Sequence, residues 1–194
     1  MFSFDQHTLS EALRADLPMI LEENQQLLQK VSVEEIAALA LLMQESKRIF
    51  VTGAGRTGLM MKAAAMRFMH MGFTVHVVGE ITTPAILKGD LLLAASGSGT
   101  TSSIVKAAEK AHAAGATVAA LSTTTDSPLA AIAQFVLLIP AAQKQDFNAT
   151  ISQQYAGSLF EQSILLIADA LFQAIWKLSD AAPEDVWKRH ANME

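Results

Sequence analysis

The chain has 194 residues, of which 51% are hydrophobic and 17% charged, and its formal net charge is −5. So many apolar residues exclude a disordered chain, and the acidic balance gives no electrostatic footprint for nucleic acid or an anionic membrane. The sequence contains no cysteine, which excludes disulfides, thiolate catalysis and cysteine-bound metals. A charged fraction below the usual value of about 25% indicates surplus apolar surface, which favours self-association.

The first elements expected along the chain are two helices. Residues 5–29 carry apolar side chains at helical spacing among polar ones. The second helix is expected to open at Ser32, where Ser-Val-Glu-Glu is typical of a capping box, and to run to about Ser46. Residues 1–17 lack the basic start and apolar run of a secretory signal, so we expect a cytoplasmic protein.

From residue 48 onward, short apolar runs rich in strand formers alternate with helical patterns. Apolar residues on both faces of the strands, with helices between them, predict a parallel sheet covered on both sides. Strands are expected at 48–52, 73–78, 90–95, 116–121 and 135–139. The intervening helices are expected at 56–71, from the turn at 96–103 to about 114, and at 127–133.

The last predicted helix, 157–178, is long and mostly apolar. Because it carries Glu161 and Asp169, and one acidic residue near the centre of a membrane span costs about 2.5–3.5 kcal/mol, we predict a helix buried in protein instead. The polar stretch 140–156 before it is the one long loop, and loops of this length are usually functional or mobile. We predict a single domain, with N-terminal helices at 1–46, an αβα core at 47–180 and a C-terminal tail at 181–194.

Two glycine-rich turns follow predicted strands, at the edge where parallel sheets bind ligands. The second, SGSGTTSS at 96–103, combines glycines that admit an anion, hydroxyl donors and the start of a helix with free backbone N–H groups. It therefore predicts a cradle for one phosphate group, and a solvated capping turn is the alternative. No lysine follows this turn as in a P-loop, which disfavours nucleoside triphosphate hydrolysis.

The first turn, GAGRTG at 53–58, fits the GxGxxG pattern, and Glu80 lies near the expected position of a ribose-binding acid. Dinucleotide binding is therefore an alternative, although the chain is short for a second, catalytic domain and Arg56 is unusual within that pattern. We favour a role for Arg56 and Thr57 at the same ligand as the second turn, where Arg56 pairs with phosphate or developing oxyanion charge. An exposed arginine at a helix start is the other interpretation.

The order of these segments resembles the sugar isomerase (SIS) domain, through GAGRTG, VVGEITTPAI and GDLLLAASGSGTTSS. GSLFEQSILLIADAL and the terminal RHANME are similar to the 6-phospho-3-hexuloisomerases of that family. The resemblance implies a five-stranded, three-layer αβα domain, a homotetramer, and no cofactor or metal. It implies interconversion of D-arabino-3-hexulose 6-phosphate and fructose 6-phosphate, next to 3-hexulose-6-phosphate synthase in the ribulose monophosphate pathway of formaldehyde fixation. Thr57 stands where the family usually has serine, and it keeps the hydroxyl.

The implied reaction moves a proton between two carbons through an enediol, which one base performs from one face. We predict Glu161 as this base, with Glu80 as second candidate; simple complementation of the helix dipole is the alternative for Glu161. The matched tail makes His190 a predicted acid or base for ring opening or hydroxyl proton transfer, in its own subunit or a neighbouring one; a solvated tail histidine is the alternative. The predicted substrate-binding residues are Gly55, Arg56, Thr57, Ser96, Gly97, Ser98, Gly99, Thr100 and Thr101.

Two other functions fit the SIS turns. One is an isomerase for another phosphosugar, such as arabinose 5-phosphate, and the FEQ segment and the tail speak against it. The other is a non-catalytic module that senses a phosphosugar, which would not need Glu161 and for which no DNA-binding segment is evident in the sequence.

Overall fold

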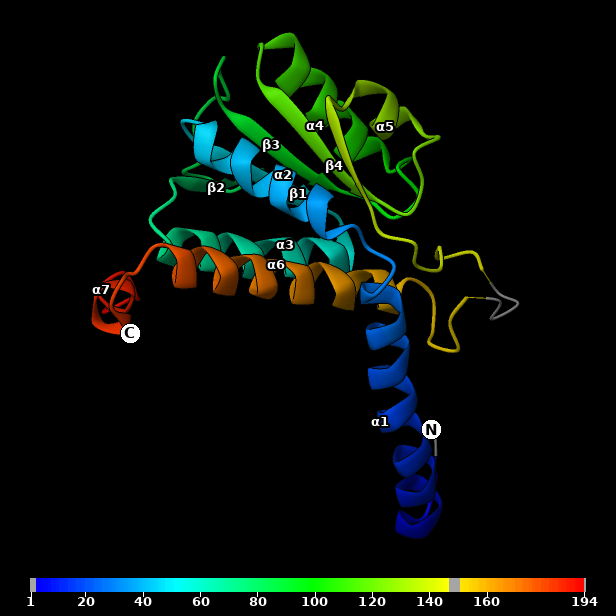
Figure 1. Ribbon diagram of the computed structural model, residues 1–194. Coiled ribbons are helices and arrows are strands. Elements are labelled where there is room, and N and C mark those ends of the chain that lie inside the picture. The colour runs from blue at the N-terminus through cyan, green and yellow to red at the C-terminus, as the bar shows by residue number, and fades with distance from the viewer. Residues whose placement is uncertain (1–2, 147–150, 194) are drawn as a thin grey trace.

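The computed structural model describes residues 3–146 and 151–193. A parallel sheet of five strands forms its middle layer, in the order β2-β1-β3-β4-β5, with helices on both faces (Figure 1). This confirms the predicted α/β architecture and the five expected strands. The strands are β1 Ile49–Gly53, β2 Val75–Val77, β3 Leu91–Ala95, β4 Thr117–Ser122 and β5 Phe135–Leu138.

The helices begin where the sequence carries start signals. Asp5 accepts a hydrogen bond from the Thr8 amide at 2.8 Å, and Ser32 Oγ accepts one from the Glu35 amide at 3.1 Å, as the capping box predicts. The helices are α1 Gln6–Leu28, α2 Val33–Glu45, α3 Gly55–His70, α4 Ser102–Ala113, α5 Pro128–Ile132, α6 Ser158–Leu178 and α7 Pro183–Trp187.

Alternate residues of each strand enter two separate cores. Val51 and Leu93 face a core that α2, α3 and α6 cover, whereas Phe50 and Leu92 face a core that α4 and α5 cover. Helix α6 is long and apolar enough to cross a membrane by length and composition. Its buried side chains nevertheless belong to the first core, where α6 lies alongside α3 (Figure 1), as predicted for a helix buried in protein.

The strand order places a topological switch point between β1 and β3. The chain runs from β1 outward to β2 on one side and from β3 outward to β4 on the other. The connections that follow β1 and β3 therefore diverge, which leaves room for a ligand at their carboxyl ends. Both glycine turns lie at this point.

An ion pair joins the opposite, amino ends of β1 and β3. Arg48 Nε donates to Asp90 Oδ1 at 3.0 Å, and the Leu87 amide donates to Asp90 Oδ2 at 2.8 Å. Burial raises the pKa of Asp90, but the hydrogen bonds from Arg48 and Leu87 and the charge of Arg48 outweigh burial and hold that pKa below its ordinary value. The pair therefore fastens the two central strands at the end away from the glycine turns.

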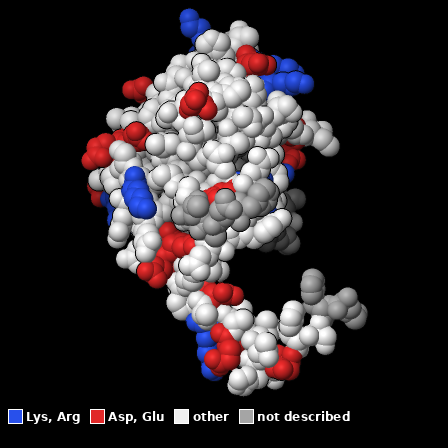
Figure 2. Space-filling model, turned by 90° about the vertical axis from the view of Figure 1, so that its right-hand side faces the viewer, with Lys and Arg blue, Asp and Glu red and all other residues white. Residues whose placement is uncertain are grey.

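Two features differ from the sequence predictions or go beyond them. Helix α7 lies in the segment that was predicted only as a tail, and Pro183 with Glu184 and Asp185 in its first turn supplies the start signal. Helix α1 projects from the body of the protein (Figures 1 and 2). It exposes a stripe of four leucines at helical spacing, Leu9, Leu13, Leu17 and Leu21.

Candidate active site

A cavity of about 240 Å³ lies at the carboxyl ends of β1 and β3, where the switch point predicts a ligand. Six of the predicted substrate-binding residues line it: Thr57, Ser96, Gly97, Ser98, Thr100 and Thr101. The rest of its wall comes from the ends of the β1 and β3 segments, from the start of α6 and from the segment after β5. Those additional lining residues are Ala54, Ala95, Ala142, Gln143, Lys144, Gln145, Gly157 and Phe160.

The turn at 96–101 is held in shape by the end of β4. The Gly97 carbonyl accepts hydrogen bonds from the Thr123 amide at 3.0 Å, from Thr123 Oγ1 at 2.8 Å and from Ser122 Oγ at 3.1 Å. Gly99 has a φ of +64°, and a Cβ added there would lie 2.1 Å from Ser127 Oγ. Only glycine therefore fits this position without a shift of the turn or of Ser127.

The hydroxyl groups of this turn face one another inside it. Ser96 Oγ and Thr101 Oγ1 are 3.1 Å apart, and Ser98 Oγ and Thr100 Oγ1 are 2.8 Å apart. All four side chains line the cavity. They can reorient their O–H groups toward an anion without moving the backbone.

Three helices begin at this cavity without a side-chain cap. The residues that precede α3, α4 and α6 are Ala54, Thr101 and Gly157; all three line the cavity, and none caps its helix through a side chain. Helices α1, α2 and α5 are instead capped by side chains. Uncapped first turns leave N–H groups free at the positive end of the helix dipole, which is the arrangement that binds phosphate. We refer to the turn 96–101 and the start of α4 as the anion cradle.

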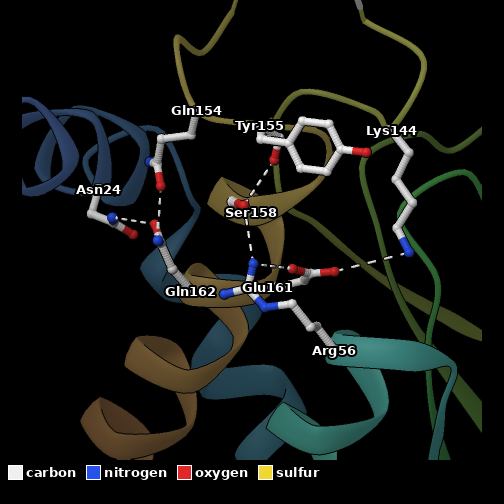
Figure 3. Close-up of polar contacts among 8 residues, drawn as sticks. All are labelled: Asn24, Arg56, Lys144, Gln154, Tyr155, Ser158, Glu161 and Gln162. Atoms are coloured by element: carbon white, nitrogen blue, oxygen red, sulfur yellow. Dashed lines mark hydrogen bonds and ion pairs between the residues drawn. The ribbon is translucent and has the colours of Figure 1, made fainter. Parts of the chain in front are cut away.

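Glu161 does not itself line the cavity, but it directly follows Phe160, which does; it lies in the first turn of α6, and only 4% of it is exposed. Its Oε2 is 3.1 Å from Arg56 Nη1, and its Oε1 is 3.9 Å from Lys144 Nζ (Figure 3). Arg56 Nη1 also donates to Ser158 Oγ at 3.0 Å, which fixes the guanidinium over α6. The Glu161 carboxylate is therefore buried between two cations, one of which, Lys144, lines the cavity.

Lys144 and Phe160 were not among the predicted site residues. Lys144 lies in the polar loop 140–156, which the sequence indicated to be functional or mobile, and it follows the carboxyl end of β5. A lone cation at that edge of the sheet is the signal that would have identified it. Residues 147–150 of this loop lie outside the described residues.

The glycines of the first turn have a packing role. A Cβ on Gly58 would lie 2.6 Å from the Gly53 carbonyl oxygen, so α3 approaches β1 closely only because residue 58 is glycine. Gly55 opens α3 with a φ of +59°. The GxGxxG spacing is thus explained by the strand-to-helix connection. Glu80, the acid expected for a ribose, pairs with Lys62 at 2.6 Å and does not line the cavity.

His190 is not brought to the cavity of its own chain. Its ring stacks on His70 at 3.8 Å and on Trp187 at 4.5 Å, because α7 folds the tail back against the end of α3. Arg189 Nη1 donates to the His70 carbonyl at 3.0 Å and secures this arrangement. His70 ends α3 and Arg56 lies in its first turn, so His190 is about 20 Å from Arg56 along the helix.

The fold and this cavity define an α/β domain with a candidate anion-binding site at the switch point of its sheet. The chain belongs to the SIS domain family, whose model matches residues 42–166. It is 52% identical to the 3-hexulose-6-phosphate isomerase of Mycobacterium gastri, over 92% of this chain and 90% of that protein. It is 41% identical to the 3-hexulose-6-phosphate isomerase of Bacillus subtilis, over 84% of this chain and 89% of that protein.

A solved structure carries the same similarity. A Methanococcus jannaschii protein, whose crystal structure was taken to infer the function of 3-hexulose-6-phosphate isomerase, aligns with a TM-score of 0.80 and 27% identity. The alignment covers 93% of this chain and 99% of that one. Within the SIS family, the chain is a member of the 3-hexulose-6-phosphate isomerases, which confirms the resemblance found in the sequence.

Proposed function

We propose that this chain interconverts D-arabino-3-hexulose 6-phosphate and fructose 6-phosphate. The observation that carries the proposal is the position of the buried Glu161 carboxylate beside the anion cradle, within a chain 52% identical to an isomerase of that name. Such a substrate needs hydrogen-bond donors for its phosphate, which the anion cradle supplies. Its reacting carbons need a proton acceptor, which the Glu161 carboxylate supplies.

The phosphate binds at the turn 96–101 and the uncapped start of α4. Backbone N–H groups and hydroxyls supply the donors there. On the face of the molecule in Figure 2 the charged side chains are scattered and form no basic patch. Helix ends and hydroxyls explain how a chain with a net charge of −5 holds a phosphorylated sugar.

The chemical step uses Glu161 as the base. Glu161 removes the proton from carbon 2 of the 3-ketose, the electrons of that C–H bond form a carbon 2–carbon 3 double bond, and the carbon 3 carbonyl oxygen becomes an enediol oxygen. Arg56 stabilises the negative charge that develops on oxygen. The proton of the carbon 2 hydroxyl passes to the carbon 3 oxygen as the carbon 2 carbonyl forms, and protonated Glu161 returns its proton to carbon 3.

One assay tests the proposed activity. Ribulose 5-phosphate, formaldehyde and an authentic 3-hexulose-6-phosphate synthase are incubated with and without this chain, and fructose 6-phosphate is measured through a coupled dehydrogenase. We expect fructose 6-phosphate to accumulate only when the chain is added. No acceleration over the synthase alone would overturn the proposal. Turnover of arabinose 5-phosphate instead would assign the chain to a different phosphosugar.

The proposal extends to the setting of the enzyme. We place it in the cytoplasm, as a homotetramer, acting directly after the synthase and without a cofactor or metal. The exposed leucine stripe of α1 supports self-association, because four leucines in one row exceed what a monomer usually leaves in water. His190, which lies away from the cavity of its own chain, is proposed to act at the cavity of a neighbouring subunit.

A further inference from the structure

Helix α1 contacts the polar segment that leads into the active-site helix. Glu23, in the last turns of α1, is partly buried and accepts three hydrogen bonds from this segment. Ser152 Oγ donates at 2.6 Å, the Gln153 amide at 2.6 Å and Gln154 Nε2 at 3.0 Å. Ser152 itself is buried. One carboxylate therefore holds three consecutive residues that lie about 130 positions away in the sequence.

A second connection runs through the amide next to the base. Asn24 Nδ2 donates to Gln162 Oε1 at 2.7 Å, and Gln162 Nε2 donates to Gln154 Oε1 at 2.8 Å (Figure 3). Gln154 thus accepts from Gln162 and donates to Glu23, so each amide has a single consistent orientation. Since Gln162 directly follows Glu161, the network fixes the first turn of α6 from the side opposite the cavity.

The same segment ends at the groups that hold Arg56. Ser158 Oγ donates to the Tyr155 carbonyl at 2.8 Å and accepts from Arg56 Nη1 at 3.0 Å (Figure 3). Arg56 in turn lies 3.1 Å from Glu161. A continuous row of hydrogen bonds and covalent neighbours therefore leads from Glu23 to the carboxylate of Glu161.

We propose that Glu23 is a positioning residue for the isomerisation, which sets the geometry of Glu161 and Arg56 through residues 152–158. This inference rests on the proposed role of Glu161 as base. Burial raises the pKa of Glu23, but the hydrogen bonds from Ser152, Gln153 and Gln154 outweigh burial and hold that pKa below its ordinary value. Glu23 is thus a carboxylate at neutral pH, with acceptor capacity for all three donors.

Glu23→Gln removes the negative charge and replaces one accepting carboxylate oxygen by an NH2 group. That NH2 group would face the N–H and O–H donors of residues 152–154. We expect kcat to fall by about tenfold to a hundredfold, with KM for the phosphosugar changed by less than about threefold, because misplacement of a catalytic group affects the chemical step more than phosphate binding. The matched control is Glu22→Gln, the neighbouring acid of α1, which accepts a hydrogen bond from Gln26 on the helix surface at 3.0 Å. We expect the control to retain wild-type kcat.

A double-mutant cycle separates positioning from loss of structure. In a Glu161→Gln background, adding Glu23→Gln should lower kcat much less than it does in the wild-type enzyme, because one of the two positioned groups is already gone. Full additivity of the two losses would assign Glu23 a merely structural role and overturn the inference. If Glu161→Gln lowers kcat but Glu23→Gln has the same kcat as Glu22→Gln, the inference about Glu23 is overturned. The proposed function of the enzyme would then remain intact.

A second variant covers the case in which Glu23→Gln does not fold. Gln154→Leu breaks the link between Glu23 and Gln162 but leaves the Ser152 and Gln153 hydrogen bonds to Glu23. We expect a smaller loss of kcat in the same direction, with a thermal midpoint within a few degrees of wild type. Unchanged kcat in folded Gln154→Leu protein would contradict the proposed route through Gln162.

Discussion

Glu161 combines near-complete burial with two cations at ion-pair distance, and this combination distinguishes it from the other acids of the site region. Glu80 pairs with one lysine at the surface, and Asp169, further along α6, pairs with Arg67 at 3.3 Å while nearly half of its side chain remains exposed. Of these three acids, only Glu161 pairs with Arg56.

Glu161→Gln keeps the size of the side chain and removes its ability to take a proton. We expect a loss of kcat of at least about a hundredfold, the usual contribution of a general base, with phosphosugar binding retained. The coupled assay gives kcat, and calorimetric titration with fructose 6-phosphate gives binding. Asp169→Asn, the same change on the same helix, is the control and should keep wild-type turnover. Wild-type turnover in Glu161→Gln protein would exclude Glu161 as the base.

Gly99→Ala tests the cradle. The added methyl group meets Ser127 Oγ at 2.1 Å and forces a positive φ on alanine, so the turn at 96–101 must shift. We expect KM for the phosphosugar to rise by about tenfold or more, because the donors no longer converge on one anion. Gly79→Ala is a control: Gly79 also has a positive φ, of +93°, but a Cβ there contacts nothing within 4 Å. If the two variants had the same KM, the cradle would lie elsewhere.

Of the six predicted residues that line the cavity, all but Thr57 belong to one continuous turn after β3. Ser96, Ser98 and Thr101 meet because the turn is local, so their spacing alone predicts their proximity. Lys144 and Glu23 reach the site region from distant parts of the chain, and no short-range pattern marks such contacts. His190 shows the opposite case: a motif identified the residue, but the packing of α7 decided its place.

At the scale of secondary-structure elements, hydrophobic periodicity predicted every long helix and all five strands, because each buries a regular face. Helix α7 has five residues, too few for a periodic pattern, and only its proline and acidic start indicate it. Strand β2 is shorter than the apolar run 73–78 suggested. It lies at the edge of the sheet and pairs with β1 over three residues, before the chain turns at Gly79.

The Arg48–Asp90 pair makes a prediction for the two central strands. Asp90→Asn leaves Arg48 without its charge partner, and because the Asp90 side chain is only 2% exposed, we expect unfolding to become easier by about 1–3 kcal/mol. Urea denaturation measures this change. The control is Asp185→Asn, which breaks the exposed pair with Lys188 and should change stability much less. Equal effects of the two variants would show that the Arg48–Asp90 pair contributes little.

The same pair sets a pH dependence. The folded protein holds the pKa of Asp90 below its ordinary value, so its stabilising contribution is fully present above about pH 4 and is lost as the pH falls through the folded-state pKa. The wild type should therefore lose more stability than Asp90→Asn between about pH 5 and pH 3. Parallel curves of unfolding free energy against pH for the two proteins would contradict this account.

At the scale of the whole molecule, the leucine stripe of α1 is an apolar surface that no other part of the described chain covers. We expect the protein to elute as a species of four times the chain mass of 20.8 kDa, and we expect Leu13→Glu with Leu17→Glu to lower that mass. Light scattering after size exclusion measures both. The control is Leu59→Glu, an equally exposed leucine on α3. A monomeric wild type would refute the tetramer, and an unchanged mass in the double variant would place the interface elsewhere.

Assembly also tests the proposed role of His190. If His190 serves a neighbouring subunit, Glu161→Gln chains and His190→Ala chains should each be weakly active, and a mixed oligomer should regain activity through sites that combine both intact residues. The two variants are mixed, unfolded together and refolded. The coupled assay then measures the recovered activity. Deletion of residues after Lys188 should also reduce turnover without unfolding the domain. An unchanged turnover rate after this deletion would mean that His190 has only a structural role, packed against the end of α3.

The placement of the base on α6 has a consequence for synthesis on the ribosome. Arg56 contacts Ser158 at the start of α6, 102 positions further along the sequence. The strands β1 and β3 and the anion cradle all precede α6. A nascent chain that has emerged only through β5 lacks Glu161, the proposed base, and the α3 face that α6 later covers is still bare. With Glu161 as the base, conversion of the substrate therefore requires translation to have passed the start of α6, however much of the sheet has already formed.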